Sequence, residues 1–218
     1  MTVHWWAREG LDYREGELHL GRQNLADLVK SAGTPTFVYD ATRVAHNLER
    51  IHTALDKHAV EHEIFFALKA NRYLPLLTFL KLNDQCGLDV CSPNELRLGR
   101  QLGFREEQIV YTNTSVSKED IEWLAMHPRV HVNVDSLSSL RRLATRCPGR
   151  SIGLRINPQM GVAYHDHLTY SGDKITKFGI YADRFVEALE LASELGAPIN
   201  TQHFQEGSGY MTPDFDKF

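Results

Sequence analysis

The chain has 218 residues, of which 42% are hydrophobic and 24% are charged, and its formal net charge is −4. The acidic balance argues against a nucleic-acid partner, which would favour a basic face. No apolar run approaches the length of a membrane span. The three cysteines are odd in number and lack metal-ligand spacing, and the N-terminus does not resemble a signal peptide. These features predict a cytoplasmic protein of one domain, or of one domain and a fragment.

The N-terminal segment, residues 1–33, is predicted to be an adaptor that precedes a main domain at residues 34–218. Within the adaptor, Glu17–Leu20 alternates between polar and apolar residues and predicts a strand. Asn24 is suited to cap a short helix, and Gly33 to end it.

The main domain is predicted to begin with a strand at Thr36–Tyr39, and Asp40 is suited to cap the helix that follows. Apolar residues recur in that helix at helical spacing, at Val44, Leu48, Ile51 and Leu55.

Strands and helices then alternate to the end of the chain. The predicted strands lie near 64–69, 88–91, 109–112, 131–134, 151–156 and 200–205. The predicted helices lie near 73–82, 93–102, 117–125, 136–145 and 182–195. Such alternation is typical of βα units around a parallel sheet. Because a closed (β/α)8 barrel has eight strands, the fold class expected is α/β, an incomplete TIM-type barrel.

Lys69 is the most informative single residue. It ends the apolar run that begins at Ile64, which we interpret as a strand buried on both faces. A buried ammonium costs several kcal/mol unless it is paired or neutralised, and enzymes resolve this with a Schiff-base lysine of lowered pKa. The alternative is a lysine whose head simply reaches solvent at the strand end.

Polar and charged residues recur where the other predicted strands end. Asp89 lies in one short strand that runs into a turn, Arg155 lies in another, and a fourth strand ends in His203 and the glycine-rich turn Gly207–Gly209. In a parallel barrel these ends form the face that holds the active site.

These segments together resemble one family. FALKAN at 66–71, GLDVCSPNEL at 87–96, LRINP at 154–158, TKFGI at 176–180 and the final GSG are similar to the fold-type III, pyridoxal-phosphate-dependent amino-acid decarboxylases, in particular their diaminopimelate decarboxylase-like members. The resemblance runs from about Thr34 to the last residue, and its motifs are specific only in combination. It implies a lyase that acts on a small amino-acid substrate, with a homodimer as the full-length form.

The resemblance also implies site residues. Lys69 would be the catalytic lysine that joins the aldehyde of pyridoxal 5′-phosphate. The cofactor-binding set would be Lys69, Asp89, Glu95, Arg155, His203, Gln205, Gly207 and Ser208. Arg155 has a second interpretation, as a structural ion-pair partner of Asp89 or Glu95.

Two positions depart from the family pattern. Relatives carry a second histidine, which stacks on the cofactor ring, where this chain has Gln205, and an apolar residue where it has Glu206. An amide can pack on a ring but cannot supply an acid–base contact. One interpretation is a variant tolerated in a specialised decarboxylase, and the other is a decayed or regulatory protein.

The chain is expected to be the N-terminal part of a longer enzyme, or a truncated relative of one. Thr212 and Pro213 predict the start of a helix just before the last residue. The family's acidic partner of the pyridinium nitrogen and its C-terminal β-domain are not matched. The resulting hypotheses are a decarboxylase of diaminopimelate or a related basic amino acid, a non-catalytic homologue, and a small pyridoxal-phosphate carrier barrel.

A metal site is not predicted. Tyr164–His167 contains two histidines, but in an extended chain they point to opposite sides, and no further ligand is specified.

Overall fold

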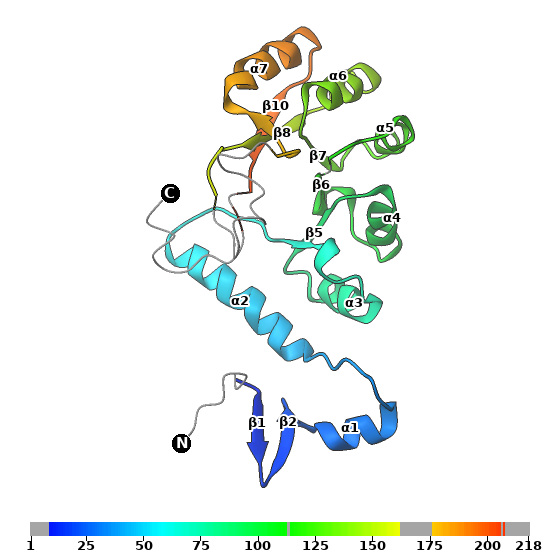
Figure 1. Cartoon of the computed structure of the whole chain (residues 1–218), viewed down its shortest axis with the longest axis vertical. Helices are drawn as coiled ribbons and strands as arrows, with labels where there is room; N and C mark the ends of the chain where they lie inside the picture. The colour runs from blue at the N-terminus through cyan, green and yellow to red at the C-terminus, as the bar shows by residue number, and fades with distance from the viewer. Residues whose placement is uncertain (1–8, 113, 162–175, 206, 208–218) are drawn as a thin grey trace. The chain divides into compact units, whose positions relative to one another are not determined.

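The computed structural model describes residues 9–112, 114–161, 176–205 and 207 (Figure 1). The chain forms two compact units. The first comprises Met1–Ile64 and Tyr73–Cys86, and the second comprises Phe65–Arg72 and Gly87–Phe218. No helix among the described residues is long and apolar enough to span a membrane.

The first unit opens with a small antiparallel sheet and a short helix. Glu15 and Gly16, both with positive φ, join the first two strands, which is the geometry of a two-residue hairpin turn. Asn24 caps the helix as predicted, because its Oδ1 accepts from the backbone N of Ala26 at 2.8 Å. The elements are β1 (Leu11–Arg14), β2 (Glu17–Leu20), β3 (Gln23–Asn24) and α1 (Leu25–Ala32).

The predicted strand at Thr36–Tyr39 is wrong. No strand is assigned there, and Phe37 is 90% exposed. Alternation predicts an extended backbone, but a strand also needs a neighbour to complete its hydrogen bonds, and no described residue provides one. The following helix, α2 (Ala41–Lys57), is capped by Asp40 as predicted, and α3 (Leu74–Asn83) completes the unit.

The second unit is a parallel sheet with helices between its strands. The strand order is β10-β8-β7-β6-β5-β4, and β9 pairs with β8. Figure 1 shows α4, α5, α6 and α7 following one another along the sheet, and these neighbours are in contact. The strands are β4 (Phe65–Ala67), β5 (Gly87–Val90), β6 (Ile109–Thr112), β7 (His131–Val134), β8 (Ile152–Asn157), β9 (Ile180–Tyr181) and β10 (Ile199–His203). The helices are α4 (Pro93–Gln101), α5 (Lys118–Ala125), α6 (Leu137–Arg146) and α7 (Phe185–Glu194).

The alternation predicted from the sequence is therefore confirmed in order and type. All six expected strands are present within a few residues of their predicted positions, and β9 is an additional short strand. The core lies between the sheet and the helices, where Leu88, Ile109 and Leu154 are fully buried. Gly99 lets α4 approach the sheet, because a Cβ there would lie 2.9 Å from a methyl carbon of Leu88.

Candidate functional site

Parallel pairing brings the carboxyl ends of the strands in the second unit to one edge. Ala67 pairs with Asp89, Thr112 pairs with Asn133, and His203 pairs with Arg155. Asp89 therefore lies on the strand next to β4, and Arg155 and His203 lie on neighbouring strands, with β6 and β7 between β5 and β8.

Lys69 lies beyond the strand that was expected to hold it. β4 has only three residues, all half-buried, and Lys69 is exposed in the one-turn 3-10 helix Leu68–Ala70. The prediction of a lysine ending a strand buried on both faces is wrong, because the fully buried Leu68 takes the core position and the next residue turns outward. The ammonium nevertheless lies close enough to influence Asp89 and His203 electrostatically.

Glu95 is held from two sides in the first turn of α4. Its Oε1 accepts from Nε of Arg72 at 2.7 Å, and its Oε2 accepts from the backbone N of Cys91 at 2.8 Å and from the Cys91 thiol at 3.2 Å. Burial alone would raise the pKa of Glu95, but these hydrogen bonds lower it below its usual value. The carboxylate is therefore ionised, and both of its oxygens already have protein partners.

Arg155 is a buried guanidinium whose charge interacts with two carboxyl groups. Burial raises the pKa of Asp89 and of Asp135, and the charge of Arg155 opposes the rise at both. Arg155 also lies over the ring of Phe178, 4.7 Å from its centroid, and donates from Nη2 to Oε1 of Gln205 at 3.4 Å. The arginine thus joins four side chains at the carboxyl edge of the sheet.

His203 is neutral at physiological pH. Burial, followed by the charges of Arg155 and Lys69, lowers its pKa to about 4. Its Nδ1 is buried without a hydrogen-bond partner among the described residues. An unpaired buried polar atom is costly unless a ligand or water completes it, so this ring is suited to receive a polar ligand atom.

Sequence reasoning missed the polar residues inside the sheet. Thr112, His131, Asn133 and Asp135 lie on or just after β6 and β7, and three of them are buried. The available signal was polarity at alternate positions, His131, Asn133 and Asp135, in and just after the strand predicted near 131–134. Period-two spacing places these three on one face of the sheet.

Part of the predicted site lies outside the described residues. The structure does not describe Glu206, Ser208, the segment Tyr164–His167 or the helix expected after Thr212. Gly207 is described, as a residue in an isolated β-bridge. Among described residues, no group of three or more histidine, cysteine, aspartate or glutamate side chains could hold a metal ion.

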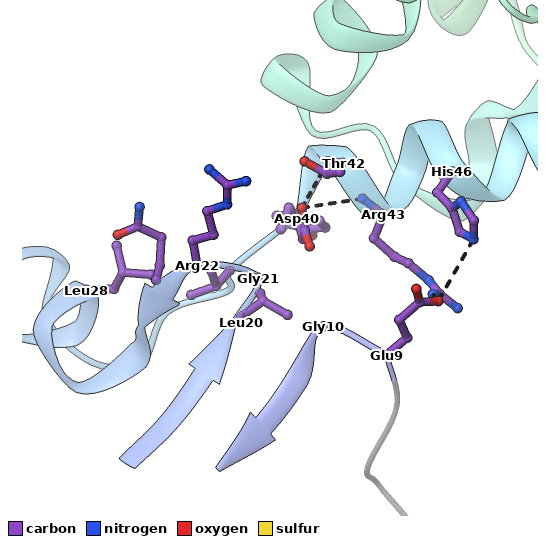
Figure 2. A pocket seen from close by; sticks show the side chains of 13 residues that line it. Glu9, Gly10, Leu20, Gly21, Arg22, Leu28, Asp40, Thr42, Arg43 and His46 are labelled. Atoms are coloured by element: carbon purple, nitrogen blue, oxygen red, sulfur yellow. Dashed lines mark hydrogen bonds and ion pairs between the residues drawn. The ribbon is translucent and has the colours of Figure 1, made fainter. Parts of the chain in front are cut away.

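The first unit contains a separate cavity of about 790 Å³ (Figure 2). None of the candidate site residues lines it. Both carboxylates that line it are already engaged, since Glu9 binds Arg43 at 3.0 Å and Asp40 caps α2. We therefore place the candidate site at the carboxyl edge of the parallel sheet and not in this cavity.

Comparison with known proteins identifies similar sequences over nearly the whole chain. Residues 42–216 match the family model described as pyridoxal-dependent decarboxylase, pyridoxal binding domain. The diaminopimelate decarboxylase of Methanothermobacter thermautotrophicus is 31% identical over 201 residues, which cover 92% of this chain and 46% of that protein. A probable chloroplastic diaminopimelate decarboxylase of Oryza sativa subsp. japonica is 32% identical, with 96% and 45% covered.

Solved structures of diaminopimelate decarboxylases are also similar to this chain. A mutant of the diaminopimelate decarboxylase from Helicobacter pylori, complexed with L-lysine, aligns with a TM-score of 0.74 at 26% identity, covering 85% of this chain and 47% of that chain. The M. jannaschii diaminopimelate decarboxylase in complex with L-lysine aligns with a TM-score of 0.77 at 23% identity, covering 93% and 49%, and supports the fold alone. The predicted fold class, an incomplete α/β barrel, is confirmed. The chain spans about half the length of the relatives it matches.

Proposed function

Because the chain belongs to the family of pyridoxal-dependent decarboxylases, through their pyridoxal binding domain, we propose that it binds pyridoxal 5′-phosphate through Lys69 and serves the decarboxylation of an amino acid. When bound, this cofactor supplies an electron sink for the electrons released as carbon dioxide leaves. The protein supplies attachment, orientation and electrostatics.

The observation that carries this proposal is the group of side chains around Lys69. The exposed ammonium of Lys69 acts by its charge on Asp89 and on the neutral His203, and the buried Arg155 acts by its charge on the same two groups. Nδ1 of His203 has no hydrogen-bond partner in the part of the chain that the structure describes, and it fits a polar atom of a bound ligand. An accessible primary amine is the group that an aldehyde requires, so the residues present fit the cofactor.

The remaining residues have proposed supporting roles. Gln205 would pack against the face of the cofactor ring, oriented by its hydrogen bond from Arg155. Glu95 would hold Arg72 and the start of α4 in place. Gly207 and Ser208 would bind the phosphate through backbone N–H groups, since such turns form anion sites.

The proposed substrate is diaminopimelate or a related basic amino acid. The relatives above are named diaminopimelate decarboxylases, and two of the solved ones carry L-lysine. The proposal includes a homodimer as the active form of the full-length protein.

Reduction with borohydride in the presence of pyridoxal phosphate tests the attachment. Peptide mapping should find the pyridoxyl group on Lys69, because reduction fixes the imine where it forms. Lys69→Arg keeps the positive charge but should lose the label, whereas the matched control Lys177→Arg should keep it. Labelling of Lys81, Lys174 or Lys177 in place of Lys69 would overturn the proposal.

Gln205→His should strengthen cofactor retention about fivefold, because an aromatic stacking partner contributes about 1 kcal/mol beyond its buried area. Absorbance titration of the chain with pyridoxal phosphate measures the change, and Gln205→Leu controls for packing without aromatic stacking. Equal or weaker binding by the histidine variant would count against Gln205 as a ring contact.

A further inference from the structure

Arg72 lies three residues after Lys69, just beyond the one-turn helix Leu68–Ala70, and so far it has only the role of a partner for Glu95. We propose that Arg72 binds a carboxylate of the amino-acid substrate and favours substrates that have a second carboxylate. The inference rests on the proposed function and deepens it, because it names a residue that distinguishes one substrate class at that site.

Glu95 holds the guanidinium of Arg72 along one edge. Nε of Arg72 donates to Oε1 of Glu95 at 2.7 Å, and Nη2 lies 2.5 Å from the same oxygen. A guanidinium presents its N–H donors in a planar fork, so a carboxylate on the Nε side leaves a second pair of donors, from Nη1 and Nη2, at the outer end. Within the part of the chain that the structure describes, Nη1 of Arg72 makes no hydrogen bond.

The carboxylate that Arg72 contacts is itself fixed in place. The side chain of Glu95 is 4% exposed, and its Oε2 accepts from the backbone N of Cys91 at 2.8 Å and from the Cys91 thiol at 3.2 Å. The side chain of Arg72, in contrast, is 57% exposed, so a ligand can reach it. A donor that is already anchored loses less conformational freedom when it binds, and this anchoring distinguishes Arg72 from a mobile surface arginine.

Lys69 and Arg72 lie close to one another on the carboxyl edge of the sheet. Three residues of even a fully extended chain span at most about 11 Å, a distance that a ligand and two long side chains bridge easily. Both residues also act on one thiol. Burial and Glu95 raise the pKa of Cys91, and the charges of Lys69 and Arg72 oppose the rise. A ligand attached to Lys69 therefore lies near the outer end of the Arg72 guanidinium.

A carboxylate is the group of an amino acid that fits this outer end. Its two oxygens match a pair of guanidinium N–H groups, whereas an ammonium is repelled. The phosphate of the cofactor has a proposed place at Gly207 and Ser208, and the buried Arg155 donates to Gln205. Arg72 is therefore available to the substrate. Diaminopimelate has a second carboxylate and lysine does not, so Arg72 favours diaminopimelate.

The test is a nitrogen-15 NMR titration of the full chain, labelled at arginine and without cofactor. The probe is pimelate, a dicarboxylate with the carbon chain of diaminopimelate, and the Arg72 Nε signal is assigned by its loss in Arg72→Met. Pimelate should shift this signal, and cadaverine, a diamine without a carboxylate, should not. Calorimetry should give a dissociation constant for pimelate about tenfold higher in Arg72→Met. Arg72→Lys should recover little of this loss, because an ammonium lacks the fork.

Arg146 is the matched control. It also donates from Nε to a carboxylate, that of Glu122 at 2.8 Å, and its side chain is about half exposed, but it ends α6, at the edge of the sheet opposite the carboxyl ends. Its Nε signal should not respond to pimelate, and Arg146→Met should bind pimelate as the wild type does. Equal responses of Arg72 and Arg146, or unchanged binding by Arg72→Met, would overturn the inference.

A second titration separates the substrate carboxylate from the cofactor phosphate. Arg72→Met should keep the wild-type preference for pyridoxal phosphate over pyridoxal, which lacks the phosphate. Loss of that preference would assign Arg72 to the phosphate and overturn its role toward the substrate. The pimelate titration requires no cofactor, so its result is independent of whether Lys69 binds pyridoxal phosphate.

Discussion

Arg155→Met is expected to lower the free energy of unfolding by about 3 kcal/mol near neutral pH, since the variant removes a buried cation whose charge attracts two nearby carboxyl groups. Arg155 is 8% exposed and carries the charge that Asp89 and Asp135 share. Methionine fills much of the volume but offers no charge and no donor. The buried Asp135 and the half-buried Asp89 would then lack the charge of Arg155, although Lys69 would still attract Asp89.

The free energy of unfolding that Arg155→Met loses should depend on pH in a defined direction. Without Arg155, the pKa values of Asp89 and Asp135, already raised by burial, rise further. A carboxyl group whose pKa is higher in the folded state stabilises the fold below its unfolded pKa, and this contribution disappears as pH rises through the folded value. The deficit of the variant should therefore be small in mild acid and grow toward neutral pH.

Urea unfolding at about pH 5 and about pH 8 measures this dependence. Arg146→Met is the matched control, because Arg146 binds Glu122 at 2.8 Å with both side chains about half exposed. An exposed pair of this kind contributes roughly 1 kcal/mol or less. A deficit for Arg155→Met that is the same at both pH values would contradict the role assigned to the two carboxyl groups.

The order of the elements could be predicted because each carries a local signal. Asn24 and Asp40 cap their helices through the contacts that their side chains suggest. Alternating apolar strands and helices then indicate a parallel sheet, whose geometry alone brings Asp89, Arg155 and His203 to one edge. These inferences need no knowledge of distant contacts.

The sequence-based predictions are wrong where contacts with residues distant in the sequence determine the local structure. Thr36–Tyr39 has the composition of a strand but lacks a pairing partner among the described residues. Lys69 follows an apolar run, yet a one-turn helix directs it outward. The hydrogen bond from Asn133 to Thr112 could not be predicted, because it depends on the register of β6 against β7 and on the space left by Gly153.

Arg150→Met is expected to cost about 3 kcal/mol for a different physical reason. Arg150 is a buried cation. Its side chain donates hydrogen bonds to backbone carbonyls in the segment from the end of α5 to the start of β7. Its Nη1 donates to Leu124 O at 2.7 Å, and its Nη2 donates to Val130 O at 2.6 Å and to His127 O at 3.1 Å. Each carbonyl left without a donor in a buried site costs roughly 1–3 kcal/mol, less whatever water recovers.

The two arginine variants should differ in their response to pH. Carbonyl groups do not titrate, but the charge of Arg150 also lowers the pKa of His131. Between about pH 5 and about pH 8 the deficit of Arg150→Met should therefore grow only through this one histidine, and less than that of Arg155→Met, which acts on two carboxyl groups. Arg150→Lys should recover only part of the loss, because one ammonium cannot reproduce the geometry of the guanidinium fork. Urea unfolding of the three variants under the same conditions makes the comparison. Full recovery by lysine would mean that charge, and not the geometry of three carbonyl contacts, is what Arg150 contributes.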